Sequence, residues 1–334
     1  MKLAFIPLIL FFLLQGKTDF AQSKETRFLI DTCITILKNK SVNAKTVNWD
    51  TIHKNALLKA KDISDPNQLG EVIRYIYGSV NDFHGAFFYR DSTFKISHEN
   101  KPIPDSVMNE WKKGIKVKTG ILKHNIGYLR IPYMPTGSRK ENNETTQNLN
   151  DSLCSLLEKN IKGIVIDLRL NGGGDMHLMI LGVQQLLGTG LVGSFLTRTK
   201  EEWILKNNIF FADTTEIVSI VPKCSENAQN MPVVLLTSTA TGSSGEFFII
   251  AFKGRKKTTL IGTETAGYVT VVEGLPVNEN AYMYISVGYA ADRTGKVYKK
   301  EIMPDIVLTA PDKFNDIEND EKVISAIDWI KQQL

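Results

Sequence analysis

Three amphipathic stripes run through the N-terminal part of the chain. Between Thr26 and about Val80, apolar residues recur at steps of three and four, which is the spacing of one helix face. The clearest stripe follows Asp65-Pro66, a typical helix start, and consists of Leu69, Val72, Ile73, Ile76, Tyr77 and Val80. This pattern predicts a small three-helix bundle. Its last helix leads directly into Asn81-Asp82-Phe83-His84, so we expect His84 at an exposed helix end, as a catalyst or as a plain surface residue.

The hydrophobic pattern changes after a polar stretch at about residues 99–120. That stretch contains Pro102 and Pro104, and we expect it to be a linker into a second region. Beyond it, residues 126–131 and 163–167 are short apolar runs typical of buried strands. The stripe between them, which predicts a helix, consists of Leu149, Leu153, Leu156 and Leu157. Strand, helix, strand predicts a parallel βαβ unit and the α/β class.

The same alternation continues to the C-terminus. Residues 233–236 and 259–262 predict further strands, and an apolar helix follows Glu246. Residues 283–287 predict a strand that precedes a hairpin turn at residues 292–295. A closing helix with Asp320 as its cap carries Val323, Ile324, Ile327 and Ile330.

Consecutive glycines follow the strand at residues 163–167. The segment reads Asp167-Leu-Arg169-Leu-Asn171-Gly-Gly173-Gly174-Asp175 and leads into a helical stripe. Such glycines can present backbone N–H groups outward as an oxyanion hole. A phosphate loop is the rival interpretation, but the chain lacks both the Gly-Lys-Ser/Thr end of a P-loop and the Gly-x-Gly-x-x-Gly order of a dinucleotide fold. A purely structural tight turn is the other alternative.

A second polar turn, Thr241-Gly-Ser243-Ser244-Gly-Glu246, connects the strand at residues 233–236 to its helix. Unpaired N–H groups and the positive end of the helix dipole face this turn, so they favour negative charge that develops beside a serine. Ser243 or Ser244 is therefore a candidate nucleophile, and the alternative is a simple helix cap. Thr241 replaces the glycine that the α/β-hydrolase elbow requires two residues before its serine.

The first residues bear on location. Met1-Lys2 precede an almost entirely apolar run at residues 3–14, and Ala21 or Ser23 offers a small residue for cleavage. Residues 1–22 therefore predict a secretory signal peptide, and we expect a secreted or periplasmic protein. No later segment is long enough to span a membrane.

Charge and cysteine content exclude further classes. The net charge is +4 over 334 residues, and no basic run is interleaved with aromatic residues, which argues against a nucleic-acid partner. Cys33, Cys154 and Cys224 have no paired spacing, which argues against a zinc site or a disulfide framework and leaves a single bridge open.

Four motifs in series resemble the S41 peptidases, the C-terminal processing and tricorn-like serine proteases. They are Asp167-Leu-Arg-x-Asn-x-Gly-Gly, Thr241-Gly-Ser-Ser-Gly-Glu, Gly262-x-x-Thr-x-Gly267 and Pro304-Asp-Ile. The resemblance implies a ClpP/crotonase-like core, with Ser243 as nucleophile. It also implies an oxyanion hole built from the N–H groups of Ser244 and Gly173, with Gly174 adjacent, and neither metal nor cofactor.

The resemblance also bears on the base that activates the serine. Processing proteases use a lysine directly after the Thr-x-Gly turn, where this chain has Tyr268, whereas tricorn-like members use an N-terminal histidine. Asn81-Asp82-Phe83-His84 resembles the Asp-Gly-His motif of secreted relatives, which favours His84, although Phe83 replaces the small residue. Glu301, shortly before Pro304-Asp-Ile, is the corresponding candidate for a third member.

The predicted organisation is a signal peptide at 1–22, a helical domain at 23–100 and a peptidase core at 101–334. About forty residues separate His84 from residue 126, too few for the PDZ domain of many processing members. We expect a serine endopeptidase acting on proteins or peptides. One alternative is a degenerate binder of hydrophobic ligands or peptides, since retinoid-binding proteins resemble the same core; another is a crotonase-type acyl-transfer enzyme.

Overall fold

The computed structural model describes residues 22–96, 102–225 and 227–334. The predicted signal peptide therefore lies outside the described residues except for its last position. The helices of the described part are α1 (Lys24–Lys40), α2 (Trp49–Lys59), α3 (Gly70–Ser79), α4 (Asp105–Lys112), α5 (Arg139–Leu157), α6 (Met176–Gly182), α7 (Gln184–Leu187), α8 (Ser244–Phe252) and α9 (Glu321–Gln332).

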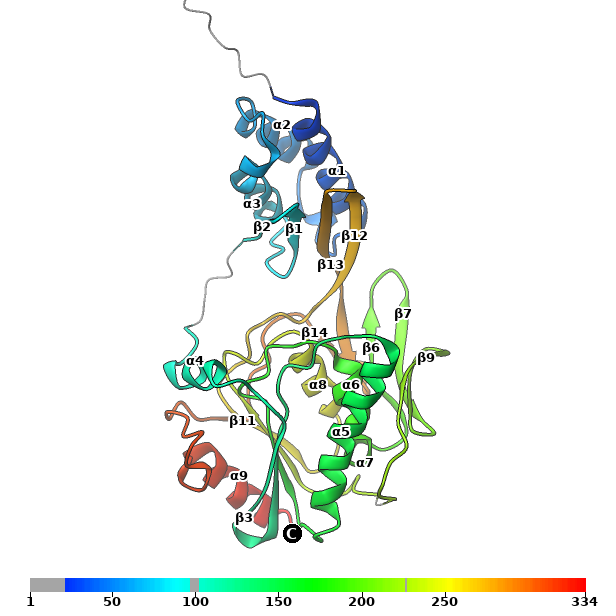
Figure 1. Cartoon of the computed structure of the whole chain (residues 1–334), viewed down its shortest axis with the longest axis vertical. Helices are drawn as coiled ribbons and strands as arrows, with labels where there is room; N and C mark the ends of the chain where they lie inside the picture. The colour runs from blue at the N-terminus through cyan, green and yellow to red at the C-terminus, as the bar shows by residue number, and fades with distance from the viewer. Residues whose placement is uncertain (1–21, 97–101, 226) are drawn as a thin grey trace, which may run out of the picture.

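Its strands fall into two sheets (Figure 1). They are β1 (Ala86–Tyr89), β2 (Ser92–Phe94), β3 (Lys118–Leu122), β4 (Ile126–Arg130), β5 (Ile164–Asp167), β6 (Gly190–Leu196), β7 (Lys200–Lys206), β8 (Ile209–Ala212), β9 (Thr215–Ser219), β10 (Val233–Thr237), β11 (Thr258–Gly262), β12 (Thr270–Asn278), β13 (Ala281–Asp292), β14 (Val297–Tyr298) and β15 (Ile306–Val307).

The first sheet carries the predicted βαβ unit and is mostly parallel. Its strand order is β15-β11-β10-β5-β4-β3, and β3 is antiparallel to its neighbour. Leu235 of β10 lies between Ile166 of β5 and Leu260 of β11. The loops that follow β5, β10 and β11 therefore leave the sheet at one edge, where α/β proteins commonly bind ligands.

Both faces of this sheet are covered, which explains why its strands are continuous apolar runs rather than alternating ones. Helix α9 packs on one face through Val323, Ala326 and Ile330. Helices α5, α6 and α8 cover the other face and contribute to the largest apolar cluster. Strands β6–β9 close over these helices from the opposite side (Figure 1).

Helices α1–α3 form the predicted bundle, but it shares its core with the C-terminal half of the chain. The β12–β13 hairpin extends from the core toward the helices (Figure 1), and Ala281, Met283 and Ile285 are buried among their apolar residues. Strand β13 pairs with β1 near its start and with β6 near its end. The predicted domain boundary at residue 100 thus separates two stretches of sequence, but residues from both stretches pack in one apolar cluster.

The linker predicted at about residues 99–120 is wrong in part. Among its described residues, α4 and the start of β3 are regular structure. Val107 is fully buried, and the Trp111 indole N–H donates to the Leu170 carbonyl at 3.0 Å. With one buried apolar residue in an eight-residue helix, this segment carries too little periodicity to be recognised in sequence.

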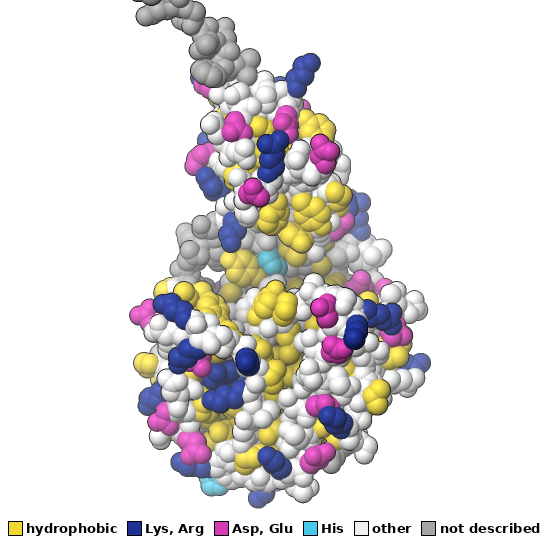
Figure 2. Space-filling model, viewed as in Figure 1, with side chains coloured by type: hydrophobic (Ala, Val, Ile, Leu, Met, Phe, Trp, Pro, Cys, Tyr) yellow, Lys and Arg dark blue, Asp and Glu magenta, His cyan; other side chains and the backbone are white. Residues whose placement is uncertain are grey.

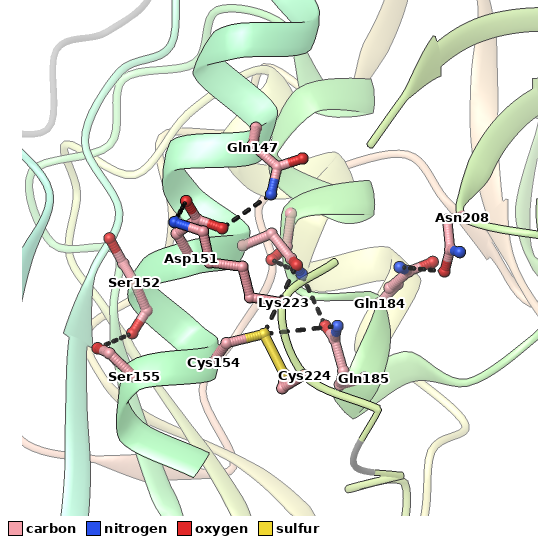
Figure 3. Close-up of a disulfide and its surroundings, with 12 residues drawn as sticks. Gln147, Asp151, Ser152, Cys154, Ser155, Gln184, Gln185, Asn208, Lys223 and Cys224 are labelled. Atoms are coloured by element: carbon pink, nitrogen blue, oxygen red, sulfur yellow. Dashed lines mark hydrogen bonds and ion pairs between the residues drawn. A yellow bond between two sulfur atoms is a disulfide. The ribbon is translucent and has the colours of Figure 1, made fainter. Parts of the chain in front are cut away.

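The structure contains the single disulfide that the cysteine content allowed. Cys154 of α5 and Cys224 of the segment after β9 form a disulfide across a separation of 70 residues (Figure 3). An ion pair between Lys223 and Asp151 lies beside it, and Gln147 donates to Asp151 at 2.8 Å. Cys33 is a buried free thiol.

No helix in the described part of the chain is long and apolar enough to cross a membrane.

Arg169 forms a buried ion network behind the glycine turn. Its guanidinium lies 2.8 Å from Asp167 and 2.7 Å from both Asp312 and Asp320. Arg169 and Asp320 are fully buried, and the Phe314 ring lies 4.7 Å from the guanidinium carbon. The network ties the C-terminal segment to the end of β5.

Candidate active site

Ser243 lies at the edge of the parallel sheet where the loops after β5, β10 and β11 meet. It is the residue immediately before α8, and its φ of 52° and ψ of −121° are unusual for a non-glycine residue. Such backbone strain persists only where neighbouring contacts hold it. Here the Ser243 N–H donates to the Glu246 carboxyl at 2.9 Å, and the Gly242 N–H donates to the Asn171 carbonyl at 3.0 Å.

Glu246 connects this turn to the loop after β11. One carboxyl oxygen accepts from the Gly267 N–H at 2.8 Å and from the Thr265 hydroxyl, and the other accepts from Ser243. The side chain is fully buried, and burial raises its pKa to about 7. The sequence placed Glu246 at the start of a helix and within the motif at residues 241–246, but it did not indicate these contacts, because the partners lie on a different loop.

His84, from the N-terminal part of the chain, lies beside Ser243. Its Nε2 lies 3.3 Å from Ser243 Oγ, and the two residues are 159 positions apart. The imidazole is half-buried rather than at the exposed helix end that the sequence predicted, and the Tyr268 ring lies 5.1 Å away. Burial lowers the pKa of His84 below its ordinary value, against the opposing influence of Asp82 and the Thr270 carbonyl. A neutral imidazole is the form that can accept a proton from a serine.

The glycine turn lies against the nucleophile. A methyl group placed on Gly173 would be 3.0 Å from Ser243 Cβ and 3.4 Å from the Ser244 nitrogen. The Ser244 hydroxyl donates to the Gly174 carbonyl at 2.6 Å, which connects the two turns. The Gly173 N–H donates to the Asn171 side chain at 3.0 Å, so this predicted oxyanion donor is engaged in the structure. The predicted components of the oxyanion hole are thus together, with Asn171 as an additional member of the turn.

Gly173→Ala should reduce reaction of Ser243 with a fluorophosphonate by about a hundredfold, the typical effect of disrupting an oxyanion hole. The reason is that Gly173 has a φ of 122°, and its new methyl group would meet Ser243. Labelling rates of the purified variant measure the effect.

The matched control is Gly172→Ala, whose methyl group would approach only the Ala240 carbonyl, at 3.9 Å. It should label at the wild-type rate. Equal labelling of the two variants would show that the close approach at Gly173 is unimportant for reactivity.

The role of Glu301 as a third triad member stays a prediction, and Thr270 is the residue that contacts Nδ1 of His84. The Nδ1 atom of His84 lies 3.0 Å from both the carbonyl and the hydroxyl oxygen of Thr270. The Glu301 carboxyl lies beside Gly267, 3.7 Å from where a Cβ on that glycine would be. Sequence reasoning missed Thr270 because no local pattern marks it, and 186 residues separate it from His84.

No group of three or more His, Cys, Asp or Glu side chains in the described residues is arranged to hold a metal ion. The predicted absence of a metal or cofactor stays a prediction. The arrangement of serine, histidine and backbone donors has the components of nucleophilic acyl transfer.

Two curated proteins are similar to this chain in sequence. The nisin-resistance protein of Lactococcus lactis subsp. lactis is 29% identical over 279 residues, covering 82% of this chain and 78% of that protein. A carboxy-terminal-processing protease of Bartonella bacilliformis is 24% identical over 213 residues, covering 64% of this chain and 45% of that protein. The chain thus spans less than half the length of that protease.

Structural and family comparisons complete the assignment. The solved structure of a lipoprotein from Streptococcus agalactiae matches with a TM-score of 0.67 and 19% identity, covering 100% of both chains, and shows the shared fold. The model of peptidase family S41 matches residues 125–308. The resemblance and the fold class predicted from the sequence are confirmed. The chain belongs to peptidase family S41.

Proposed function

We propose that this protein is an exported serine endopeptidase that acts through an acyl-enzyme on Ser243, with His84 as general base. The observation that carries the proposal is the 3.3 Å contact between Ser243 Oγ and His84 Nε2. A degenerate binding protein has no need for this contact, which joins distant segments and lies beside an unusual backbone conformation at Ser243.

The reaction follows from the positions of these groups. His84 Nε2 takes the Ser243 hydroxyl proton as Oγ attacks the peptide carbonyl. The Ser244 N–H at the start of α8 and the N–H groups of Gly173 and Gly174 stabilise the resulting oxyanion, with Gly173 turning from Asn171 to do so. His84 then gives the proton to the leaving amine, and a water activated by the same imidazole hydrolyses the ester.

We propose peptides or unfolded proteins outside the cytoplasm as substrates. The signal-like residues 1–22 and the Cys154–Cys224 disulfide support export, since such bonds persist mainly in oxidising compartments. Hydrophobic side chains gather at the narrow waist between the helical unit and the core (Figure 2), which favours apolar peptide segments. One relative is named for nisin resistance, so nisin is a candidate substrate to test.

Fluorophosphonate labelling combined with cleavage of a peptide library tests the proposal. Purified protein without residues 1–22 should take one label, on Ser243, and should cleave peptides with products identified by mass spectrometry. Folded protein that takes no label and cleaves nothing would support the ligand-binding alternative. Hydrolysis of acyl thioesters without peptide cleavage would support the crotonase-type alternative.

The rate of labelling should fall in acid with a midpoint below pH 6.5, because burial lowers the pKa of His84 from that value. His84 must be neutral to accept the serine proton, so activity is present above its pKa and lost as the pH falls through it. Labelling rates between about pH 4.5 and 8.5 give the midpoint.

Glu246 also changes its protonation within the pH range of this experiment, since burial raises its pKa to about 7. The variant Glu246→Gln separates the two groups. A midpoint near 7 that disappears in this variant would assign the titration to Glu246 and contradict the assignment to His84.

A further inference from the structure

The side of His84 that faces away from Ser243 is held by a hydroxyl group rather than by a carboxylate in direct contact. Nδ1 lies 3.0 Å from the Thr270 hydroxyl and the same distance from the Thr270 carbonyl. With Nε2 free to accept from Ser243, the neutral ring carries its proton on Nδ1 and donates it to Thr270. What lies behind Thr270 therefore affects the basicity of His84.

Hydrogen bonds continue from Thr270 to a carboxylate. The Thr270 hydroxyl lies 2.9 Å from the Ser286 hydroxyl, which lies 2.7 Å from the Asp82 carboxyl. An ionised carboxylate only accepts, so the Ser286 O–H donates to Asp82. The Ser286 oxygen then accepts from Thr270, and the Thr270 oxygen accepts from His84. All the bonds can therefore run in one direction, from the imidazole to Asp82.

The surrounding structure holds this chain of hydroxyls in place. Asp82 is 2% exposed and accepts from the Gly85 N–H and the Ser286 N–H, each at 2.8 Å. Within the described part of the chain it makes no ion pair. A register shift between Val271 and Val272 of β12 lies next to Thr270, and such bulges redirect neighbouring side chains.

We propose that Asp82 is a positioning residue that sets the orientation and basicity of His84 through Ser286 and Thr270. The proposal rests on the proposed function for its catalytic meaning. When Ser243 gives its proton to Nε2, the imidazole becomes cationic, and the aligned hydroxyls and the negative carboxylate stabilise that charge. The protons of the Thr270 and Ser286 hydroxyls stay on their own oxygens, and only the Ser243 proton moves.

The described titratable groups near His84 include Asp82 on its own loop, Tyr268 before β12 and Glu246 on α8. Glu301 lies beside Gly267, the residue before Tyr268. The Tyr268 ring is tilted by 53° to the imidazole with the centroids 5.1 Å apart, and Glu246 accepts a hydrogen bond from the Ser243 N–H. Asp82 is the group in hydrogen-bonded connection with Nδ1. It raises the pKa of His84, opposing the effect of burial.

Thr270→Val and Thr270→Ser form a matched pair for the test. Valine keeps the size and the backbone carbonyl but removes the hydroxyl, whereas serine restores the hydroxyl. Nitrogen-15 NMR of the histidine ring, assigned with His84→Ala, reports the pKa and the tautomer of His84. The pH dependence of fluorophosphonate labelling reports its catalytic role.

Thr270→Val should lower the pKa of His84 by about half a unit or more, since a charge a few ångströms away typically shifts a pKa by one or more units. It should also reduce labelling by about tenfold or more, a modest part of what general-base catalysis contributes. Thr270→Ser should restore both values. Asp82→Asn, in folded protein, should lower the pKa as Thr270→Val does.

The proposal is overturned if Thr270→Val, Thr270→Ser and wild type share one His84 pKa and one labelling profile. It is also overturned if valine and serine lower both values equally, which would indicate a general packing effect. If wild type takes no label at any pH, the proposed peptidase function fails. The NMR pKa values of His84 would still test whether Asp82 acts on it through Ser286 and Thr270.

Discussion

Ser243→Ala should abolish fluorophosphonate labelling and peptide cleavage, whereas Ser244→Ala should retain labelling at Ser243. Loss of a serine nucleophile typically costs about a millionfold in turnover, because no other group in the site can form the acyl-enzyme. Ser243 Oγ is the hydroxyl that lies 3.3 Å from His84 Nε2. Labelling followed by peptide mapping distinguishes the two serines.

The control exploits the different contacts of the two neighbours. The Ser244 hydroxyl donates to the Gly174 carbonyl, whereas its N–H, the proposed oxyanion donor, persists in alanine. We therefore expect Ser244→Ala to react more slowly but on the same residue. His84→Ala should retain Ser243 as the labelled residue at a rate lower by about a hundredfold or more. Labelling of Ser244 in the wild type, or undiminished labelling of Ser243→Ala, would refute the assigned nucleophile.

Arg169→Met should lower the free energy of unfolding by about 3–5 kcal/mol, the usual result of removing one partner from a buried ion pair. Arg169 is fully buried with Asp167, Asp312 and Asp320, and methionine would leave these carboxylates short of a donor. Burial alone would raise the pKa of Asp167, and the neighbouring arginines hold it at about 2 instead. Urea unfolding followed by tryptophan fluorescence measures the loss.

The matched control is Arg27→Met, which breaks an ion pair with Asp31 that is exposed on both sides. An exposed pair of this kind contributes at most about 1 kcal/mol, so the control should unfold close to wild type. Similar midpoints for the two variants would mean that the buried network contributes nothing beyond an ordinary surface ion pair.

The main elements of the fold could be predicted from the chain because each had a local pattern. The stripe at Leu69–Val80 is an example, since helical periodicity alone places α3. Strands β5 and β10 were recognisable as apolar runs with turn signals at their ends. Helix α4 and the antiparallel strands β6–β9 were not predicted. Their residues alternate less regularly, and partners distant in the chain bury them.

In the candidate site, too, some residues could be recognised from local sequence motifs and others only from the structure. Ser243, Gly173 and His84 were found because each lies in a short motif at the end of a regular element. The engagement of the Gly173 N–H by Asn171, and the position of Thr270 at His84 Nδ1, depend on contacts that no motif encodes. Glu301 was implied by the family resemblance and stays a prediction, whereas the contact of Thr270 with the imidazole came from the structure alone.

The sequence by itself determined the class of this protein, the turns that carry its candidate chemistry and the family it belongs to. Hydrophobic periodicity and glycine or serine turns are local properties, and they can be recognised without knowing which segments meet. Only the tertiary structure decided which groups face the imidazole. Strand pairing and the crossing of β13 between the helical unit and the core bring Asp82 to Ser286, 204 residues away. Contacts at such separations follow from the packing of whole elements, so the sequence could name a candidate nucleophile and a candidate base but not the groups behind that base.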